Sequence, residues 1–346
     1  MKILGLETSC DETAAAIVTG GSKVLANVLA SSLPLHAVTG GIIPEVAARE
    51  QAKTIIPVIR EVLWSSKAFS RGATKVGVQV EQLSPNIDAI AVVFGPGLIG
   101  SLLVGVETAK VLAYVWNKPI VPVNHLLGHL YSAWLNNPSP PKFPLVSLIV
   151  SGGHTELLLV SDHGKYKHLG GTKDDAAGEA FDKSARLIGL GYPGGPAIEK
   201  ASVSGNPKRY LLPRPLIASP DYDFSFSGLK TAAVNLVAKL TSSGRNLTKQ
   251  QVADLSASYQ EAVIDVLVTK TVKAARSSQA KNIVLGGGVA ANKGLRERMS
   301  ASFKGPVFYS ESAFSIDNGA MVASAAYFNY KPIPWRKIKA DPAILF

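Results

Sequence analysis

The chain has 346 residues, of which 47% are hydrophobic and 18% charged, and its formal net charge is +11. This composition is typical of a globular protein with a core and excludes an intrinsically disordered chain. The single cysteine, Cys10, excludes an internal disulfide framework and a cysteine-rich zinc site. Without a signal-like N-terminus or an apolar run long enough to span a bilayer, we expect a soluble, cytoplasmic protein with no membrane partner.

The first half of the chain is expected to open with three short β-strands joined by polar turns. A strand, a Gly-rich turn and a helix follow, and then a strand that leads into a helix near His125. The expected strands are 3–7, 14–18, 23–29, 87–94 and 119–123, and the expected helices are 44–64 and 101–116. Residues 65–86 are polar and weakly patterned, which favours a loop.

The second half repeats this order of elements. Its expected strands are 146–150, 156–160, 166–169, 282–285 and 306–309, and its helices include 248–276, 291–299 and 317–327. The repetition predicts a duplicated α/β fold of the actin, Hsp70 and sugar-kinase type (ribonuclease H-like), in which two lobes enclose a central cleft. We expect the lobes at residues 1–135 and 136–330 and a basic C-terminal tail at 331–346.

Two histidines, His125 and His129, stand four residues apart at the start of an expected helix. Side chains at this spacing share one helical face and can bind one metal ion, although a capping and an exposed histidine are the alternative. Asp317 occupies the corresponding position of the second half and would add an oxygen ligand, or cap the last helix, or both. His125 is followed by leucine, not glutamate, so the general base of a zinc protease is missing.

Three Gly-rich turns are candidate anion sites, because their backbone N–H groups can point at a phosphate. They lie at 151–153, 194–196 and 286–288. The chain lacks the Gly-x-x-x-x-Gly-Lys-Ser/Thr motif, which excludes a P-loop enzyme.

Acidic residues gather in two stretches, one at the first turn and one after the second set of three strands. They are Glu7, Asp11 and Glu12, and Asp174, Asp175, Glu179 and Asp182. Asp175, Glu179 and Asp182 are expected near one helical face, where they could bind a ribose or a metal or carry a proton. The alternative is that such side chains complement the dipole at a helix N-terminus.

The positive charge is concentrated late in the chain: residues 1–172 carry a net charge of +2 and residues 173–346 carry +9. A polyanionic partner, nucleic acid first, would explain this imbalance, with a generic solubility charge as the alternative. A compact candidate RNA patch, or alternatively a solvated tail, surrounds Trp335 and comprises Lys331, Arg336, Lys337 and Lys339.

Several long motifs follow one another in a specific order. They are GLETSCDET at 5–13, GPGL at 95–98, NHLLGH at 124–129, IVSGGHT at 149–155, DDAAGEAFDK at 174–183, YPGGP at 192–196, DFSFSGLKT at 223–231, GGVAAN at 287–292 and DNGAM at 317–321. Over nearly its whole length the chain thereby resembles the tRNA N6-adenosine threonylcarbamoyltransferase family in its bacterial form.

The resemblance implies transfer of a threonylcarbamoyl group from threonylcarbamoyl-adenylate to N6 of adenosine 37 in tRNAs that read codons beginning with A. It implies one divalent metal ion, usually given as iron, on His125, His129 and Asp317, with zinc and magnesium as alternatives. It implies that the adenylate is held by Ile149, Val150, Ser151, Gly152, Gly153, Asp182, Gly195 and Asn292. It also implies two protein partners, an inactive paralogue and a small ATPase.

Two positions depart from the family pattern: Leu127 stands where the family often has glutamate, and Gln51 where it often has histidine. Both put in doubt contacts around the site, but neither belongs to the metal trio. For the chemistry, Asp11 or Glu12 is our candidate acceptor of the amine proton.

Three other functions remain open from the residues alone. An actin-fold sugar or acetate kinase would explain the Gly-rich turns, and a metalloprotease would explain the histidine pair. A non-catalytic assembly module is the third.

Overall fold

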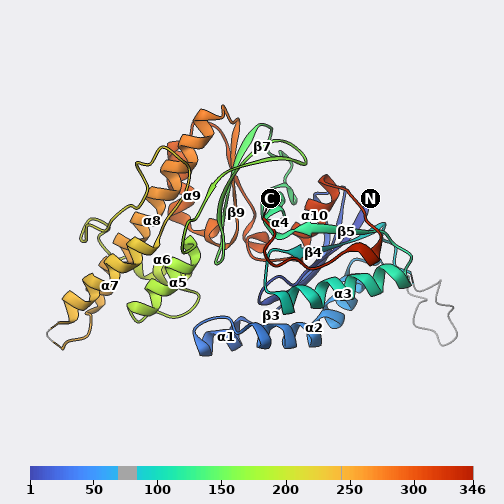
Figure 1. Cartoon of the computed structure of the whole chain (residues 1–346), viewed down its shortest axis with the longest axis horizontal. Helices are drawn as coiled ribbons and strands as arrows, with labels where there is room; N and C mark the ends of the chain where they lie inside the picture. Colours follow the sequence, from blue (N-terminus) through green and yellow to red (C-terminus); the bar gives the residue numbers. More distant parts are fainter. Residues whose placement is uncertain (69–83, 243, 346) are drawn as a thin grey trace. The chain divides into compact units, whose positions relative to one another are not determined.

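The computed structural model describes residues 1–68, 84–242 and 244–345, so most of the expected loop at 65–86 lies outside the described residues. The chain divides into two compact units (Figure 1). Unit 1 comprises Met1–Pro140 and Ser310–Phe346, and unit 2 comprises Pro141–Tyr309. Residues 310–330, which we expected in the second lobe, thus return to the unit in which the chain begins.

Unit 1 is built on a five-stranded sheet of order β3-β2-β1-β4-β5. Its strands are β1 (Lys2–Glu7), β2 (Glu12–Thr19), β3 (Lys23–Ser31), β4 (Ala89–Gly95) and β5 (Ile120–Asn124). The first three strands form an antiparallel meander, and β4 and β5 run parallel to β1. The expected strands of the first half are therefore confirmed.

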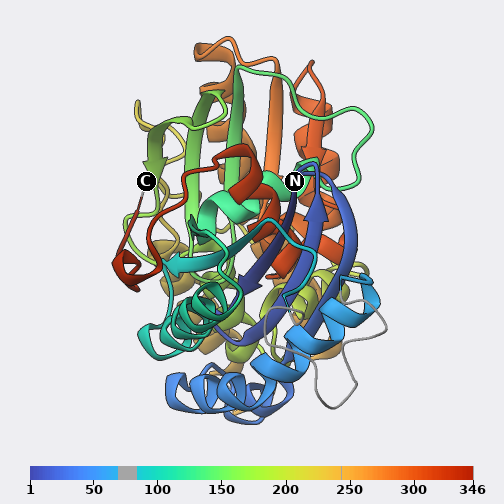
Figure 2. The ribbon, with the colours of Figure 1, turned by 90° about the vertical axis from the view of Figure 1, so that its right-hand side faces the viewer.

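Helices cover both faces of this sheet (Figures 1 and 2). They are α1 (Leu33–Thr39), α2 (Pro44–Ser65), α3 (Ile99–Val115), α4 (His125–Tyr131) and α10 (Gly319–Phe328). Leu4 and Leu6 point to one face and share an apolar cluster with α2 and α3. Gly5 points to the other face, where α10 lies against it, and this packing returns the end of the chain to unit 1.

Unit 2 repeats the connectivity of unit 1. Its sheet has the order β10-β9-β6-β7-β8, so β6 takes the place of β1 and β9 that of β4. The strands are β6 (Leu145–Val150), β7 (Thr155–Asp162), β8 (Lys165–Gly171), β9 (Asn282–Gly286) and β10 (Val307–Tyr309). The matching strand orders confirm the duplicated α/β fold.

The helices of unit 2 pack against this sheet and against one another. They are α5 (Ala177–Leu187), α6 (Gly194–Ser202), α7 (Ser227–Thr241), α8 (Lys249–Ser277) and α9 (Lys293–Ser302). The long helix α8 begins with a capping box between Thr248 and Gln251 and buries Val263 and Leu267 in the core. Among the described residues, no helix has both the length and the apolar character needed to cross a membrane.

The C-terminal segment is docked on unit 1 rather than being a free solvated tail. Ile333 forms a β-bridge with Ile120, and Ile338 is buried in the core of the unit. The ring of Trp335 lies 5.5 Å from that of Tyr114 on α3. The four basic side chains of the expected RNA patch remain exposed; they are Lys331, Arg336, Lys337 and Lys339.

Candidate metal centre and adenylate-binding turns

The histidine pair lies on the short helix α4 directly after β5. Asn124 caps this helix, since its side-chain oxygen accepts a hydrogen bond of 2.8 Å from the backbone N–H of Leu126. His125 and His129 are both buried, and their ring centroids are 4.6 Å apart. The expected common face is confirmed, and the alternative of one exposed histidine is wrong.

Asp317 meets the histidines from the far end of the chain. Its Oδ1 lies 3.2 Å from Nε2 of His129 and 3.7 Å from Nε2 of His125. Asn318, not Asp317, caps α10, because its side-chain oxygen accepts a bond from the N–H of Met321. The capping role that we considered for Asp317 is therefore wrong, and the meeting takes place within unit 1 rather than between two lobes.

The three side chains fit a metal ion. One ligand atom from each lies within 4.8 Å of the others, which suits donors that surround an ion at about 2.0–2.2 Å. Within the described part of the chain, Nδ1 of His129 is buried without a hydrogen-bond partner, and the Asp317 carboxylate lies 3.2 Å from its buried Nε2 without forming a hydrogen bond of good geometry. Burying a ring nitrogen without a hydrogen-bond partner costs free energy of folding unless a ligand binds to the imidazole. The trio can thus hold a metal, and its two nitrogens and one oxygen suit iron or zinc.

Glu7 orients one of the two histidines. Its Oε2 lies 3.1 Å from Nδ1 of His125, and the Ser9 hydroxyl lies 3.2 Å from the same nitrogen. Burial disfavours the charged imidazolium, but the carboxylates of Asp317 and Glu7 outweigh it and raise the pKa of His125 to about 9. A carboxylate that contacts the ring nitrogen not bound to the metal fixes the orientation of a metal-binding histidine. The sequence placed Glu7 among the acidic residues of the first turn but gave no sign of this contact.

Glu12 is a half-buried residue at the start of β2. Its Oε1 accepts a bond of 2.9 Å from the Ser31 hydroxyl. Its Oε2 is buried and has no hydrogen-bond partner among the described residues. Burial is the main cause that raises the pKa of Glu12 to about 8, although the bond from Ser31 opposes it. Burial and the charge of Asp317 likewise raise the pKa of Asp11 above its ordinary value.

Gln51 supports the same turn from α2. Its side-chain nitrogen lies 3.4, 2.9 and 3.0 Å from the backbone oxygens of Thr8, Cys10 and Glu12. This departure from the family pattern therefore retains a donor that fixes the turn. Leu127, the second departure, is half-buried on α4.

In unit 2, the turn after β6 forms a tight loop against the start of α5. The Ser151 N–H donates to the His154 carbonyl at 2.8 Å, and the N–H groups of Gly178 and Glu179 donate to the carbonyls of Ser151 and Gly152. A Cβ on Gly287 would lie 2.4 Å from the Val150 oxygen, so the third Gly-rich turn also touches this loop. The structure thereby brings the first and third candidate turns together.

Among the remaining candidate residues of unit 2, some already form contacts within the unit and others border open space. Asp182 accepts a bond of 2.6 Å from the N–H of Gly194, which joins α5 to the second Gly-rich turn, and burial raises the pKa of Asp182. An added Cβ would meet open space at Gly152, Gly153, Gly195 and Gly288. Ile149 and Val150 are fully buried strand residues.

Asn292 has a structural task of its own. Its side-chain oxygen caps α9 through the N–H of Leu295 at 2.9 Å. Its side-chain nitrogen donates to the Gln260 side chain at 2.8 Å. Both ends of the amide are thus engaged within unit 2.

The expectation for the second acidic stretch is partly wrong. Ala176 is the cap residue of α5, so Asp175 precedes the helix rather than lying on it. Asp175 and Glu179 are nevertheless close together, because both pair with Lys183, at 2.7 and 2.8 Å. The alternative, that an acidic side chain complements the dipole at a helix N-terminus, holds for Asp174, but the helix is α7 rather than α5.

Asp174 caps α7. Its carboxylate accepts bonds from the hydroxyls of Ser225 and Ser227, both at 2.6 Å, and from the N–H of Phe226 at 2.8 Å. The bonds from the two hydroxyls and from the backbone outweigh the effect of burial and lower its pKa. Sequence spacing could not show which helix start this side chain would reach.

Comparison with solved structures defines the class of fold. Component A of (R)-2-hydroxyglutaryl-CoA dehydratase from Acidaminococcus fermentans matches 95% of this chain and 98% of its own length, with a TM-score of 0.53 and 16% identity. Full-length HypF, in a phosphate- and nucleotide-bound form, matches 94% of this chain and 55% of its own length, with a TM-score of 0.56 and 12% identity. The chain therefore has the actin-like fold.

Sequence comparison defines the family within that class. The family described as TsaD, tRNA N6-adenosine threonylcarbamoyltransferase, matches residues 23–324. The curated tRNA N6-adenosine threonylcarbamoyltransferase of Thermomicrobium roseum is 47% identical over 99% of this chain and 94% of its own length. That of Symbiobacterium thermophilum is 50% identical over 95% and 92%. This chain belongs to the tRNA N6-adenosine threonylcarbamoyltransferase family.

Proposed function

We propose that this protein transfers the threonylcarbamoyl group of threonylcarbamoyl-adenylate to N6 of adenosine 37 in tRNAs that read codons beginning with A. The observation that carries the proposal is a buried His-His-Asp group, able to hold a metal, in a chain of this family. A sugar kinase would share the fold but has no use for that group. A metalloprotease would need a glutamate next to His125, where Leu126 stands.

In the reaction, the lone pair of N6 attacks the carbamoyl carbon, the bond from that carbon to the phosphate oxygen breaks, and AMP leaves with the electron pair. A metal ion on His125, His129 and Asp317, with iron as our first choice, supplies Lewis-acid stabilisation of negative charge on substrate oxygens. The backbone N–H groups of Gly152 and Gly153 bind the adenylate phosphate. Asp182 and Gly195 bind the rest of the adenylate.

The function is tested by incubating the protein with unmodified tRNA and threonylcarbamoyl-adenylate and analysing the nucleosides by mass spectrometry. We expect threonylcarbamoyladenosine at position 37. Its absence, with the paralogue and the ATPase added, would refute the proposal. Phosphorylation of a sugar or acetate would instead support the kinase, and peptide cleavage the protease.

For the adenylate site, we expect Gly153→Val to block substrate binding without unfolding the protein. An added Cβ meets no atom within 4 Å, so the free energy of unfolding should change little, but the valine side chain would occupy space next to the turn. Isothermal titration with AMP should show the loss. Gly189→Asn, at a glycine of φ +76° with equally open space, is the matched control and should bind AMP normally.

For proton transfer, we infer that Glu12 is the acceptor, because a carboxylate of pKa about 8 is a stronger base than an ordinary one. Glu12→Gln should slow transfer by at least about a hundredfold. The wild-type rate should rise with pH, reach half its maximum near pH 8 and level off above it. Asp11→Ala should retain transfer; if it fails while Glu12→Gln does not, the roles are reversed.

Glu12→Gln should also stabilise the protein at alkaline pH. The folded-state pKa of Glu12 lies above its ordinary value of 4.5, so its contribution to stability is complete below that value and is lost as the pH rises through 8. Thermal melts of Glu12→Gln should therefore exceed wild type at pH 9 and match it at pH 4.

For tRNA binding, we propose the exposed basic patch around Trp335 on unit 1. Replacing Lys331, Lys337 and Lys339 by glutamate should weaken tRNA binding and reduce the slope of log affinity against log salt by about 2–3. Filter binding across a salt series measures both. Reversal of Lys23 and Lys53, exposed lysines elsewhere in the same unit, is the control. Equal effects of both sets would contradict a local patch.

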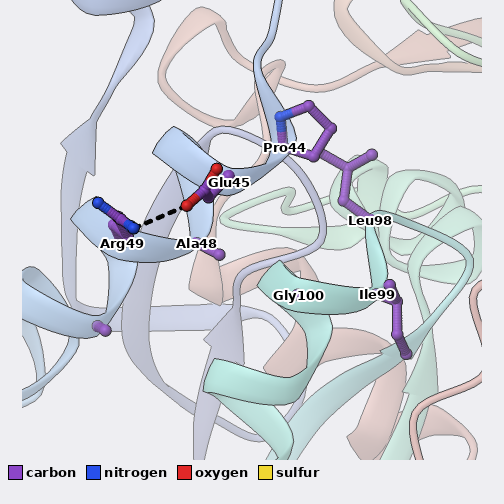
Figure 3. Close-up of a pocket in the computed structure, with 8 residues that line it drawn as sticks. Pro44, Glu45, Ala48, Arg49, Leu98, Ile99 and Gly100 are labelled. Carbon is purple, nitrogen blue, oxygen red and sulfur yellow. Dashed lines mark ion pairs between the residues drawn. The ribbon is translucent and has the colours of Figure 1, made fainter.

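For the partners, we propose an inactive paralogue and a small ATPase, with the reaction in the cytoplasm, where its tRNA is found. An exposed apolar face on α2 and α3 supports a protein partner. It includes Ile99 and Leu103 in the first half of α3 and Val111 and Val115 in the second, with the exposed Glu107 between the two pairs. A hollow of about 560 Å³ lies at its end, between Pro44 and Ile99, beside the ion pair of Glu45 and Arg49 (Figure 3).

A further inference from the structure

The geometry points to the last residues of the chain as a strap that positions the metal-binding helix, with Asn124 as the positioning residue. This C-terminal strap comprises residues 341–345. It contacts the cap of α4 directly, and it contacts the end of β4, which supports the loop that carries Ser9. The inference rests on the metal site assigned above and adds a structural requirement to it.

Asn124 connects the strap to α4 through both ends of its side chain. Its nitrogen donates a bond of 2.8 Å to the Leu345 carbonyl, and its oxygen accepts the bond from Leu126 N–H that caps the helix. A carbonyl can only accept, so the strap selects the amide orientation in which the oxygen faces the helix. Because α4 has only seven residues, its position depends on such external contacts.

The strap is itself fixed on the end of β4. The Asp341 N–H donates to the Phe94 carbonyl at 2.7 Å, and the Gly97 N–H faces the Pro342 carbonyl at 3.4 Å. At Gly95, a Cβ would lie 1.8 Å from the Asp341 oxygen, so only glycine allows this close approach. The strap is therefore held by backbone atoms of unit 1 rather than by mobile side chains.

The same β4 end supports the second contact of His125. The Leu98 N–H donates to the Ser9 carbonyl at 2.8 Å, and a Cβ on Gly97 would lie 2.5 Å from that oxygen. The Ser9 hydroxyl in turn lies 3.2 Å from Nδ1 of His125. The strap therefore influences the position of His125 in two ways, through the cap of its helix and through the loop beside its ring.

The test uses two variants that remove the strap contact in different ways. Asn124→Ser keeps a side-chain oxygen that can cap α4 but cannot reach Leu345, and a chain ending at residue 340 keeps Asn124 but lacks the strap. Each should bind Co²⁺ roughly tenfold more weakly than wild type and show a changed visible absorption of the bound ion. The combined variant should bind Co²⁺ no more weakly than the shortened chain alone, because that chain already lacks the bond that Asn124→Ser removes.

Hydrogen–deuterium exchange supplies a readout that needs no metal: the amides of α4 should exchange faster in both variants. Val58→Ala, a core substitution in α2, is the control for general destabilisation and should leave the Co²⁺ affinity and spectrum unchanged. Normal Co²⁺ binding and normal α4 exchange in folded Asn124→Ser would overturn the inference, whether or not the shortened chain folds. Failure of the wild type to bind Co²⁺ would instead refute the metal site, while the exchange experiment would still test the strap.

Discussion

Asp317→Asn and His129→Ala are each expected to abolish tight metal binding and to slow threonylcarbamoyl transfer by about a thousandfold. A Lewis acid supplies several kcal/mol of charge stabilisation, and each 1.36 kcal/mol corresponds to a factor of ten in rate. The substitutions remove one of three donors that lie within 4.8 Å of one another. Metal content by mass spectrometry and single-turnover transfer are the measurements.

His163→Ala is the matched control for this prediction, because His163 belongs to unit 2, whereas the trio belongs to unit 1, and it packs against the ring of Phe143. It should keep both metal and activity. Full activity of metal-free Asp317→Asn protein would show that the trio is structural, and the proposed role of the metal would then be wrong.

Gly5→Ala is expected to destabilise unit 1 by about 3 kcal/mol and to weaken metal binding at the same time. The new Cβ would lie 2.2 Å from the Gly319 carbonyl oxygen and 2.7 Å from the Ala323 nitrogen. Both are backbone atoms of α10, so the helix has to move away from β1, and overpacking of this kind costs about 1–3 kcal/mol. Asp317 lies two residues before α10 and would move with it.

Urea denaturation and Co²⁺ titration of Gly5→Ala measure the two effects separately. Gly20→Asn is the control: this glycine has φ +61° and no atom within 4 Å of an added Cβ, and asparagine tolerates that conformation. If Gly5→Ala lowered stability but left Co²⁺ affinity intact, the position of α10 would not determine the position of Asp317.

The sequence by itself was sufficient for the elements and their duplication. The short apolar runs at 3–7 and 14–18 and the polar turns that bound them reflect local backbone preferences, and these strands form as expected. The four-residue spacing of His125 and His129 places both on one face of any helix, whatever surrounds it. The family motifs were recognisable for the same reason, because they are contiguous in the chain.

Tertiary structure decided which distant residues complete each site. Asp317 was expected from the second lobe, yet it reaches the histidines within unit 1 because Gly5 lets α10 lie directly on β1 and Gly319 lets it lie directly on β2. Asp174 caps α7 rather than the helix that follows it, and Glu7 orients His125.

None of these contacts leaves a periodic signal in the chain. The apolar composition of α10 shows that this helix will be buried, but it does not show which sheet will cover it. The choice depends on the fit between two surfaces that meet only when the chain has folded.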